Sequence, residues 1–241
     1  MASPQKVLLL AHTPNPLEVI FASFRQCYYN GFIGDVFEDI LEGTPSKEEQ
    51  EQFIANLVKS GHVSPLEHVS FTFAIEGVSR ALTHQLVRHR IASYSQQSQR
   101  YVTGKNFSYI TPPSIEKNIK AKEKYTALME SIQETYQELL TLFQQEDIKA
   151  KECIEDIRFI LPQAAETRIV VTMNCRALLN FFEHRCCIRA QWEIRALANT
   201  MRKECTKILP SVFKESGAPC YSLKYCPEPK HLACGLFPTR D

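Results

Sequence analysis

Residues 88–101 read RHRIASYSQQSQRY, a stretch that combines three arginines with three serines and three glutamines. No aspartate or glutamate occurs anywhere from Gly77 through Ile115. Arginine offers a planar set of donors that fits a phosphate or a polarised carbonyl group, and serine and glutamine add neutral donors. The stretch therefore predicts a site for an anion that comes from outside this part of the chain.

A solvated helix face or a disordered linker is the alternative interpretation of such a polar stretch. The segment also contains Ile91, Tyr94 and Tyr101, and strand-like and helical patterns flank it closely on both sides. These apolar residues favour a position inside a packed domain. We expect one domain over residues 1–241, with a cysteine- and proline-containing tail at 213–241.

The composition of the chain is that of an ordinary globular protein. Of its 241 residues, 44% are hydrophobic and 23% are charged, and the formal net charge is +1, so a general attraction to nucleic acid or membrane is not indicated. No apolar run approaches the roughly 20 residues that span a bilayer. Nine cysteines without a signal-peptide pattern indicate reduced thiols in the cytoplasm.

Hydrophobic periodicity predicts alternating strands and helices without a regular βαβ repeat, which favours an α+β fold. The expected strands are residues 6–11, 69–76 and 167–173, with an extended segment at 101–109. The expected helices are residues 17–30, 46–60, 78–90, 115–143, 148–160 and 176–208. Ser46 and Glu49 have the spacing of a capping box, Gly61 ends that helix, and residues 62–68 form a loop fixed by Pro65.

Arginines recur on the predicted helix that starts at Arg176. Arg176 and Asn180 share one face, whereas Arg185 lies about half a rotation away at ~100° per residue. Either the helix breaks near Arg185, or its two sides serve two different sites. The second alternative is natural if neighbouring subunits share their sites.

The central stretch resembles the signature of the flavin-dependent thymidylate synthases. The six fixed positions of that signature are Arg88, His89, Arg90, Ser93, Ser98 and Arg100. Residues 64–68, the region from Arg158 to Pro162, and residues 174–194 are also similar to the family. The resemblance covers about residues 61–208, and it implies the family fold, with mixed helices and a small, mainly antiparallel sheet.

The resemblance implies an enzyme that makes dTMP from dUMP. Methylenetetrahydrofolate would donate the carbon, and FAD reduced by NADPH would donate a hydride. It also implies a homotetramer in which several chains contribute to each active site, with no nucleic-acid or membrane partner.

The same resemblance implies roles for individual residues. Arg185 would be the catalytic group, because a fixed cation beside the uracil favours negative charge on that ring. The expected dUMP-binding residues are Gln85, Leu86, Val87, Arg88, Gln96, Gln97, Ser98, Gln99, Arg100, Arg158 and Arg185. The expected FAD-binding residues are Ser64, Arg88, His89, Arg90, Gln96, Asn174, Cys175, Arg176 and Asn180, with Ser64 supplied by a neighbouring subunit.

The chain departs from some family members at a few positions. It has Ser95-Gln96 where some have Asn-Glu, and Gln99 where some have glycine, so a carboxylate role at this point does not apply here. Arg189 stands where some members have a histidine, which puts that flavin contact in doubt.

Three alternatives remain open from the sequence. A non-catalytic nucleic-acid- or nucleotide-binding protein could use residues 88–100, although a pI near 7.6 disfavours a wide basic footprint. A cysteine-nucleophile synthase would need a reactive thiol, and no Pro-Cys-His motif is present. The tail residues Cys220, Cys226, His231 and Cys234 could hold zinc or pack as reduced thiols; we expect no metal in the reaction itself.

Overall fold

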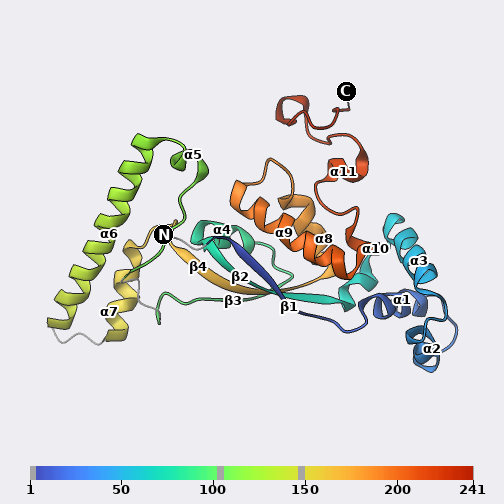
Figure 1. Cartoon of the computed structure of the whole chain (residues 1–241). Coiled ribbons are helices and arrows are strands. Elements are labelled where there is room, and N and C mark those ends of the chain that lie inside the picture. The colour runs from blue at the N-terminus through green and yellow to red at the C-terminus, as the bar shows by residue number, and fades with distance from the viewer. Residues whose placement is uncertain (1–3, 102–105, 146–149, 241) are drawn as a thin grey trace. The chain divides into compact units, whose positions relative to one another are not determined.

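The computed structural model describes residues 4–101, 106–145 and 150–240 (Figure 1). Within them, four strands form an antiparallel sheet in the order β1 (Lys6–His12), β2 (Ser70–Ser79), β4 (Glu166–Asn174) and β3 (Ser93–Gln96). Every second residue of β4 from Thr167 to Met173 is buried, as expected for a strand with one face on a core. The mixture of helices with a small antiparallel sheet confirms the predicted α+β class.

The chain divides into two compact units, each built from separated segments. Unit 1 contains residues 4–6, Ile75–Val87 and the described part of 95–170. Unit 2 contains Val7–Ala74, Arg88–Tyr94 and residues 171–240. Strands β2 and β4 each contribute residues to both units.

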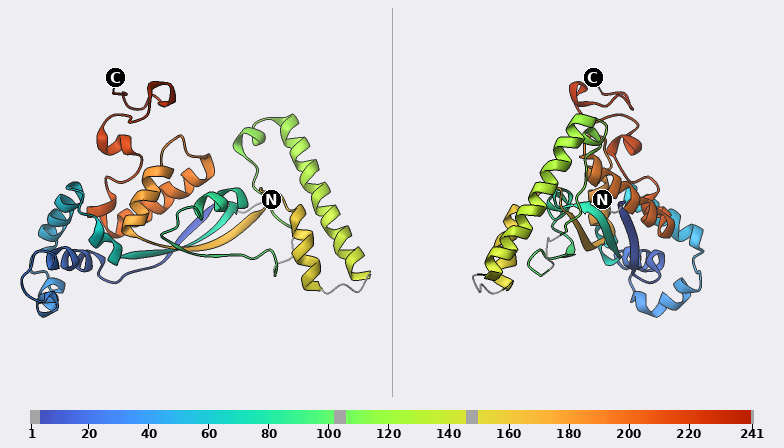
Figure 2. Two further views of the ribbon diagram at one scale, coloured as in Figure 1. Left: turned by 180° about the vertical axis from the view of Figure 1, so that it is seen from behind. Right: turned by 60° about the vertical axis from the view of Figure 1, so that its left-hand side comes forward.

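Unit 1 contains a pair of helices that pack along one another, α6 and α7 (Figures 1 and 2). Their contact buries Tyr136, Leu140, Cys153 and Ile157. The helices of this unit are α4 (Arg80–Leu86), α5 (Pro113–Glu116), α6 (Ile119–Gln145) and α7 (Ala150–Ile157), and the 3-10 turn Arg158–Ile160 follows α7.

Unit 2 contains an aromatic core in which Phe213 meets Phe71 and Phe182 edge to face, at ring-centroid distances of 5.7 and 5.9 Å. Helices α8 and α9 pack against each other beside it. The helices of this unit are α1 (Pro16–Gln26), α2 (Phe37–Leu41), α3 (Lys47–Lys59), α8 (Cys175–Arg185), α9 (Trp192–Ile208), α10 (Pro210–Phe213) and α11 (Pro219–Leu223). Its 3-10 turns are Ile33–Val36, Ser64–His68 and Lys230–Leu232.

Local sequence signals predicted α3 correctly, whereas the predicted end of α1 was wrong. The capping box between Ser46 and Glu49 is present, and Gly61 follows α3 with a positive φ of 86°. Helix α1 ends at Gln26, four residues before the predicted end. The Gln26 amide donates to the carbonyl oxygen of Gly31 at 3.1 Å and accepts from the Ile33 N–H at 2.9 Å, so its side chain stabilises a turn there.

The predicted helix at 78–90 is shorter than expected. Val78 belongs to β2, and α4 begins only after Ser79, whose hydroxyl accepts from the Leu82 N–H at 3.0 Å. Helix α4 ends at Leu86, four residues before the predicted end. In a separate part of the chain, the predicted loop at 62–68 contains the 3-10 turn Ser64–His68. A serine that can cap a helix therefore outweighed the apolar spacing that had included Val78.

The long predicted helix at 176–208 breaks directly after Arg185, so Arg176 and Arg185 still lie on two sides of one helix. Helix α8 ends there, and α9 begins at Trp192, where the Gln191 side chain accepts from the backbone N–H groups of Glu193 and Ile194, both at 3.1 Å. Part of the extended segment at 101–109 and of the helix at 148–160 lies outside the described residues. Among the described helices, none is long and apolar enough to cross a bilayer.

Candidate active site

The arginine-rich stretch is divided between the two units. Residues Arg88–Tyr94 belong to unit 2, and Ser95 to Arg100 belong to unit 1. In unit 2, the Tyr94 hydroxyl donates to the carbonyl oxygen of His89 at 2.8 Å, which fixes the turn after α4. Arg88 and Arg90 are exposed and form no ion pair with any residue that the structure describes. Two uncompensated guanidinium groups thus flank His89.

His89 and Arg185 form the most informative contact in unit 2. The Nε of Arg185 donates to the Nε2 of His89 at 3.1 Å, and the His89 ring lies edge-on to Phe181 with centroids 5.0 Å apart. Because Nε2 accepts, the proton of the neutral ring lies on Nδ1. The guanidinium of Arg185 is therefore held in place by a partner that carries no compensating negative charge.

Electrostatics support a neutral His89. Burial is the main reason that the pKa of His89 is lowered to about 4, and electrostatic interactions with Arg185 and His184 lower it further. The imidazole is then uncharged at neutral pH and remains an acceptor for Arg185. Arg185 itself is half-buried, and no carboxylate of the described chain pairs with it.

The start of α8 brings several predicted flavin-site residues together. The side-chain oxygen of Asn174 caps the helix, accepting from the Ala177 N–H at 2.8 Å. Arg176 pairs with Glu67 at 2.5 Å, in the same turn as the exposed Ser64. Asn180 is exposed on the second turn of the helix. Ser64, Arg176 and Asn180 can therefore meet a ligand at the surface of unit 2.

Cys175 differs from the other predicted flavin contacts. Its side chain is fully buried, and its N–H donates to the carbonyl oxygen of Val69 at 2.8 Å. Burial raises the pKa of its thiol well above the usual range. Leu86, predicted near dUMP, is also fully buried. Both residues are 0% exposed, so neither offers any surface to a ligand in the structure.

In unit 1, the rest of the stretch lines a small pocket of about 240 Å³ together with residues of β4. The Gln96 amide donates to the hydroxyls of Thr83 at 2.9 Å and Thr167 at 3.3 Å, while the Gln97 N–H donates to the carbonyl oxygen of Arg168 at 2.9 Å. The pocket is lined by Gln97, Ser98, Gln99, Asn106, Phe107, Ser108, Leu161, Ala165, Glu166, Thr167 and Arg168. The predicted residues Gln97, Ser98 and Gln99 thus share one pocket.

Arg100 and Arg158 meet at Glu155 on α7. The guanidinium of Arg100 forms an ion pair with the Glu155 carboxylate, and the Nε of Arg158 donates to the Glu155 carbonyl oxygen at 3.0 Å. The hydroxyl of Ser98 accepts from the Arg100 N–H at 3.1 Å. The sequence had predicted that Arg100 meets an anion from outside this part of the chain. In the structure its partner is the carboxylate of Glu155, from a distant part of the sequence.

Several residues that position these groups were not predictable from the sequence. Thr83, Thr167, Glu155 and Glu67 are ordinary polar residues on predicted helices, strands or loops, and only the fold brings them to their partners. Two further residues were predicted to bind dUMP. Gln85 is half-buried on α4, and Val87 is exposed directly after the end of that helix.

For the cysteine- and histidine-containing tail, the sequence left two alternatives open, a zinc site or packed reduced thiols. Cys220, Cys226 and Cys234 line a pocket in unit 2 with Cys187, whereas His231 is exposed and does not line it. Within the described residues, no three His, Cys, Asp or Glu side chains are grouped as a metal site requires.

Comparison with known proteins gives the family. The model of the family described as thymidylate synthase complementing protein matches residues 8–211. The chain is 55% identical to a flavin-dependent thymidylate synthase of Nitratidesulfovibrio vulgaris, over 98% of this chain and 96% of the relative. The chain belongs to this family. It is therefore an enzyme, a flavin-dependent thymidylate synthase, as the sequence had indicated.

Two further relatives carry the same description. The flavin-dependent thymidylate synthase of Clostridium tetani is 48% identical over 95% of this chain and 93% of its own length. That of Pyrococcus furiosus is 42% identical over 92% of this chain and 89% of its own length. The similarity therefore includes the whole arginine-rich stretch and both units of the chain.

Proposed function

We propose that the enzyme converts dUMP to dTMP, with methylenetetrahydrofolate as the carbon donor and FAD, reduced by NADPH, as the source of the hydride. The observation that supports this most directly is Arg185, a half-buried cation whose partner in the described chain is a neutral histidine. Such a charge stabilises an anion that forms beside it, because no internal carboxylate competes for it.

The residues of unit 2 fit FAD. Arg88 and Arg90 are exposed cations without ion pairs among the described residues, and they suit a pyrophosphate. Arg176 and Asn180 offer further donors at the surface of α8. When bound, reduced FAD would supply a hydride; the chain's own residues would bind and orient it.

The pocket of unit 1 fits the phosphate of dUMP. The Ser98 hydroxyl already accepts from the Arg100 N–H, so its own proton is free to be donated to a phosphate oxygen. The amides of Gln97 and Gln99 line the same pocket. For Arg100 to bind the phosphate, its guanidinium must exchange the Glu155 carboxylate for the ligand. We propose that dUMP makes this exchange.

The charge on Arg185 would act on the pyrimidine. Methylation of uracil at carbon 5 requires electron density there, which increases when the ring becomes anionic. A guanidinium held in a fixed position lowers the free energy of that anion without needing to reorganise. His89 would act as a positioning residue, because it accepts a hydrogen bond from the Nε of Arg185. The two terminal nitrogens of Arg185 then remain available to donate to the substrate.

A cysteine nucleophile for the pyrimidine does not fit three of the thiols of unit 2. Burial raises the pKa of Cys186 to about 11, and it raises the pKa values of Cys175 and Cys205 well above the usual range. Thiolates are the reactive form, so these groups are poorly suited to attack a pyrimidine at neutral pH.

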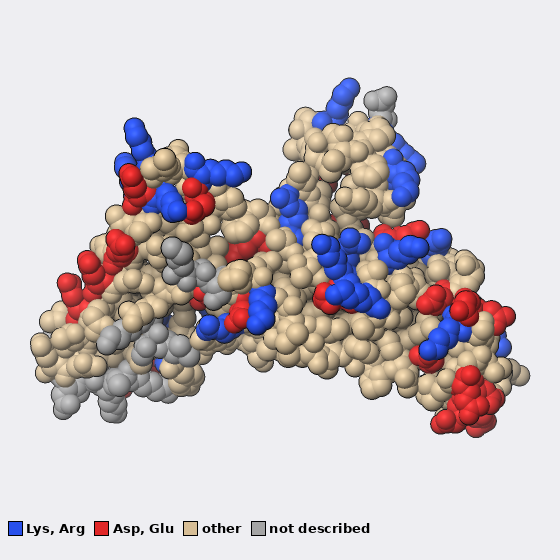
Figure 3. Space-filling model, viewed as in Figure 1, with Lys and Arg blue, Asp and Glu red and all other residues tan. Residues whose placement is uncertain are grey.

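A nucleic-acid-binding function is the second candidate, and the charges argue against it. Acidic side chains gather over α2 on the visible face of unit 2 (Figure 3), and they include Glu38 and Asp39. The formal net charge is only +1. A protein that tracks a polyanion carries a continuous basic surface instead.

We also propose a homotetramer with shared active sites, located in the cytoplasm. The shared sites rest on the family and on the opposite directions of Arg176 and Arg185, which contact Glu67 and His89 respectively. The cytoplasm rests on nine cysteines that are all free.

One experiment tests the whole proposal. The purified protein should show the absorbance of an oxidised flavin, NADPH should bleach it under anaerobic conditions, and dUMP with methylenetetrahydrofolate should then yield dTMP. Omitting any one component should abolish the product. A colourless protein that does not take up added FAD would contradict the proposal.

A further inference from the structure

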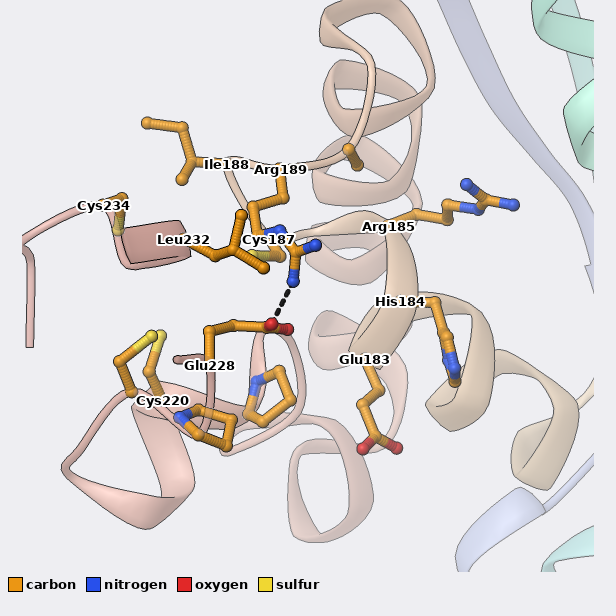
Figure 4. Close-up of a pocket in the computed structure, with 14 residues that line it drawn as sticks. Glu183, His184, Arg185, Cys187, Ile188, Arg189, Cys220, Glu228, Leu232 and Cys234 are labelled. Carbon is orange, nitrogen blue, oxygen red and sulfur yellow. Dashed lines mark ion pairs between the residues drawn. The ribbon is translucent and has the colours of Figure 1, made fainter. Parts of the chain in front are cut away.

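Unit 2 contains a second cavity that the proposed reaction does not use. It has a volume of about 440 Å³ and lies between the loop that follows α8 and the chain after α10 (Figure 4). Arg185 belongs to its wall, but the guanidinium of Arg185 points away from the labelled thiols of the cavity. The thiols of the cavity thus lie away from the charge that the reaction needs.

Thiols are the unusual feature of this cavity. Of the nine cysteines in the chain, four line it: Cys187 from the loop, and Cys220, Cys226 and Cys234 from the tail. Cys220 and Cys226 are only 8% exposed, whereas Cys234 is exposed at the surface. A reagent can therefore reach one thiol from solvent while two others lie behind it.

Cys220 is the thiol that the other three share as a neighbour. Burial raises the pKa of Cys220, and the nearby thiols of Cys187, Cys226 and Cys234 raise it further. All four thiols also line the same cavity. Cys220 is held by α11, and the backbone of Cys226 is fixed by its N–H bond to the Pro238 carbonyl oxygen at 2.7 Å.

Only noncovalent contacts hold the tail to the loop here. Arg189 of the loop forms an ion pair with Glu228 of the tail across the cavity (Figure 4). Both side chains are partly exposed, so this pair contributes little to stability. Among the described residues, no His, Cys, Asp and Glu side chains are grouped as a metal ion would require.

We propose that the cavity is a thiol–disulfide exchange site that accepts a low-molecular-weight disulfide. The thiolate of Cys234, the exposed thiol, attacks one sulfur of the reagent, which forms a mixed disulfide and releases one reagent thiol. The thiolate of Cys220 then attacks the Cys234 sulfur of the mixed disulfide and displaces the other half of the reagent as its thiol. The product is a Cys220–Cys234 disulfide. A thiolate of Cys187 or Cys226 can attack this disulfide at the Cys220 sulfur, which releases the Cys234 thiol and leaves Cys220 in a disulfide with its new partner.

The reaction balances without a further oxidant. Two protein thiols lose two protons and two electrons to become one disulfide. The two sulfurs of the reagent gain them and leave as two thiols. A reducing agent such as dithiothreitol reverses the reaction.

Peptide mapping of the full-length enzyme, with its flavin bound, tests this. The reduced protein is treated with oxidised glutathione, free thiols are alkylated, and trypsin is added. Cleavage after Arg189, Lys224 and Lys230 places the four thiols on different peptides, because each lies in a different interval between cleavage sites. We expect peptide 215–224, which contains Cys220, to be linked to peptide 186–189, 225–230 or 231–240.

The Cys220→Ser variant should lose these linked peptides, and Cys27→Ser, which changes an exposed thiol outside the cavity, should keep them. The wild-type map alone decides the matter if Cys220→Ser does not fold. Glutathione bound singly, with no linked peptide that contains Cys220, would overturn the proposal. Linked peptides that form only after denaturation would overturn it as well.

Discussion

At the scale of single residues, the proposed chemistry depends on the charge of Arg185. Arg185→Ala should keep the yellow colour and NADPH oxidation but lose most dTMP formation, because the lost contact is strongest when the pyrimidine becomes anionic. Removing such a contact costs on the order of 2–4 kcal/mol, or roughly 30- to 1000-fold in rate. Turnover measured at saturating dUMP checks this. Arg25→Ala, an exposed arginine of α1, serves as the control and should retain activity.

His89 predicts a pH dependence of stability. Its pKa is about 4 in the folded chain and ordinarily 6.5, so the unfolded chain takes up this proton first as pH falls. The stabilisation is complete above pH 6.5 and is lost as pH falls towards 4. His89→Gln keeps an acceptor for Arg185 but cannot titrate. Its free energy of unfolding should fall less between pH 7.5 and 5, by about 1 kcal/mol for a half-exposed ring. Equal losses in both proteins would contradict a neutral His89.

For the cysteines we expect retained activity, in contrast to the loss expected for Arg185→Ala. Replacing Cys186, Cys187 or Cys205 singly by serine should leave substantial dTMP formation, because the proposed reaction involves no enzyme thiol. Assays of each variant at matched flavin content check this. A variant that folds and binds both FAD and dUMP, yet forms no product, would point to a cysteine nucleophile.

At the scale of elements, Asn174 combines two roles that mutation can separate. Asn174→Ala should destabilise the protein by about 1 kcal/mol through loss of the α8 cap, whereas Asn174→Asp should keep the cap. If the Asn174 amide also donates to FAD, Asn174→Asp should still weaken flavin binding. Thermal unfolding and FAD titration measure the two effects. Ser46→Ala is the control, because it removes the cap of α3. It should lower the stability by a similar amount and leave the affinity for FAD unchanged.

If the Asn174→Asp variant binds FAD as tightly as the wild type, then Asn174 has only its structural role as a helix cap.

The sequence prediction did not identify this cap, because it started the helix at Arg176 and ended the strand at Met173. The boundary between β4 and α8 falls at Asn174, which belongs to the strand and caps the helix.

Elements determined by neighbouring residues were predictable, and those determined by distant residues were not. The capping box at Ser46 depends on four consecutive positions and was predicted correctly. Strand β3 was missed, since its polar sequence shows no apolar alternation and pairs only because β4 lies beside it. The site follows the same rule. The signature identified Arg100, but its partner Glu155 is 55 residues away and became known only from the fold.

At the scale of the whole molecule, shared active sites predict complementation between inactive variants. Ser64 and Arg185 are expected to serve one site from different subunits. Ser64→Trp and Arg185→Ala should each be inactive as homotetramers, whereas mixed tetramers should recover part of the activity, because some sites then contain neither change. Activity is measured after partial unfolding and joint refolding. No recovery, with mixed tetramers confirmed by native mass spectrometry, would contradict shared sites; each variant refolded alone is the control.

The alternation of the chain between its two units has a genetic consequence. Neither unit corresponds to one continuous stretch of coding sequence, since boundaries fall inside each of the four strands and directly after Val87. A single recombination crossover can therefore not move either unit intact into another gene. We expect homologous exchange between relatives to preserve the units only when the exchanged fragment includes nearly the whole reading frame, so the two units should share one evolutionary history.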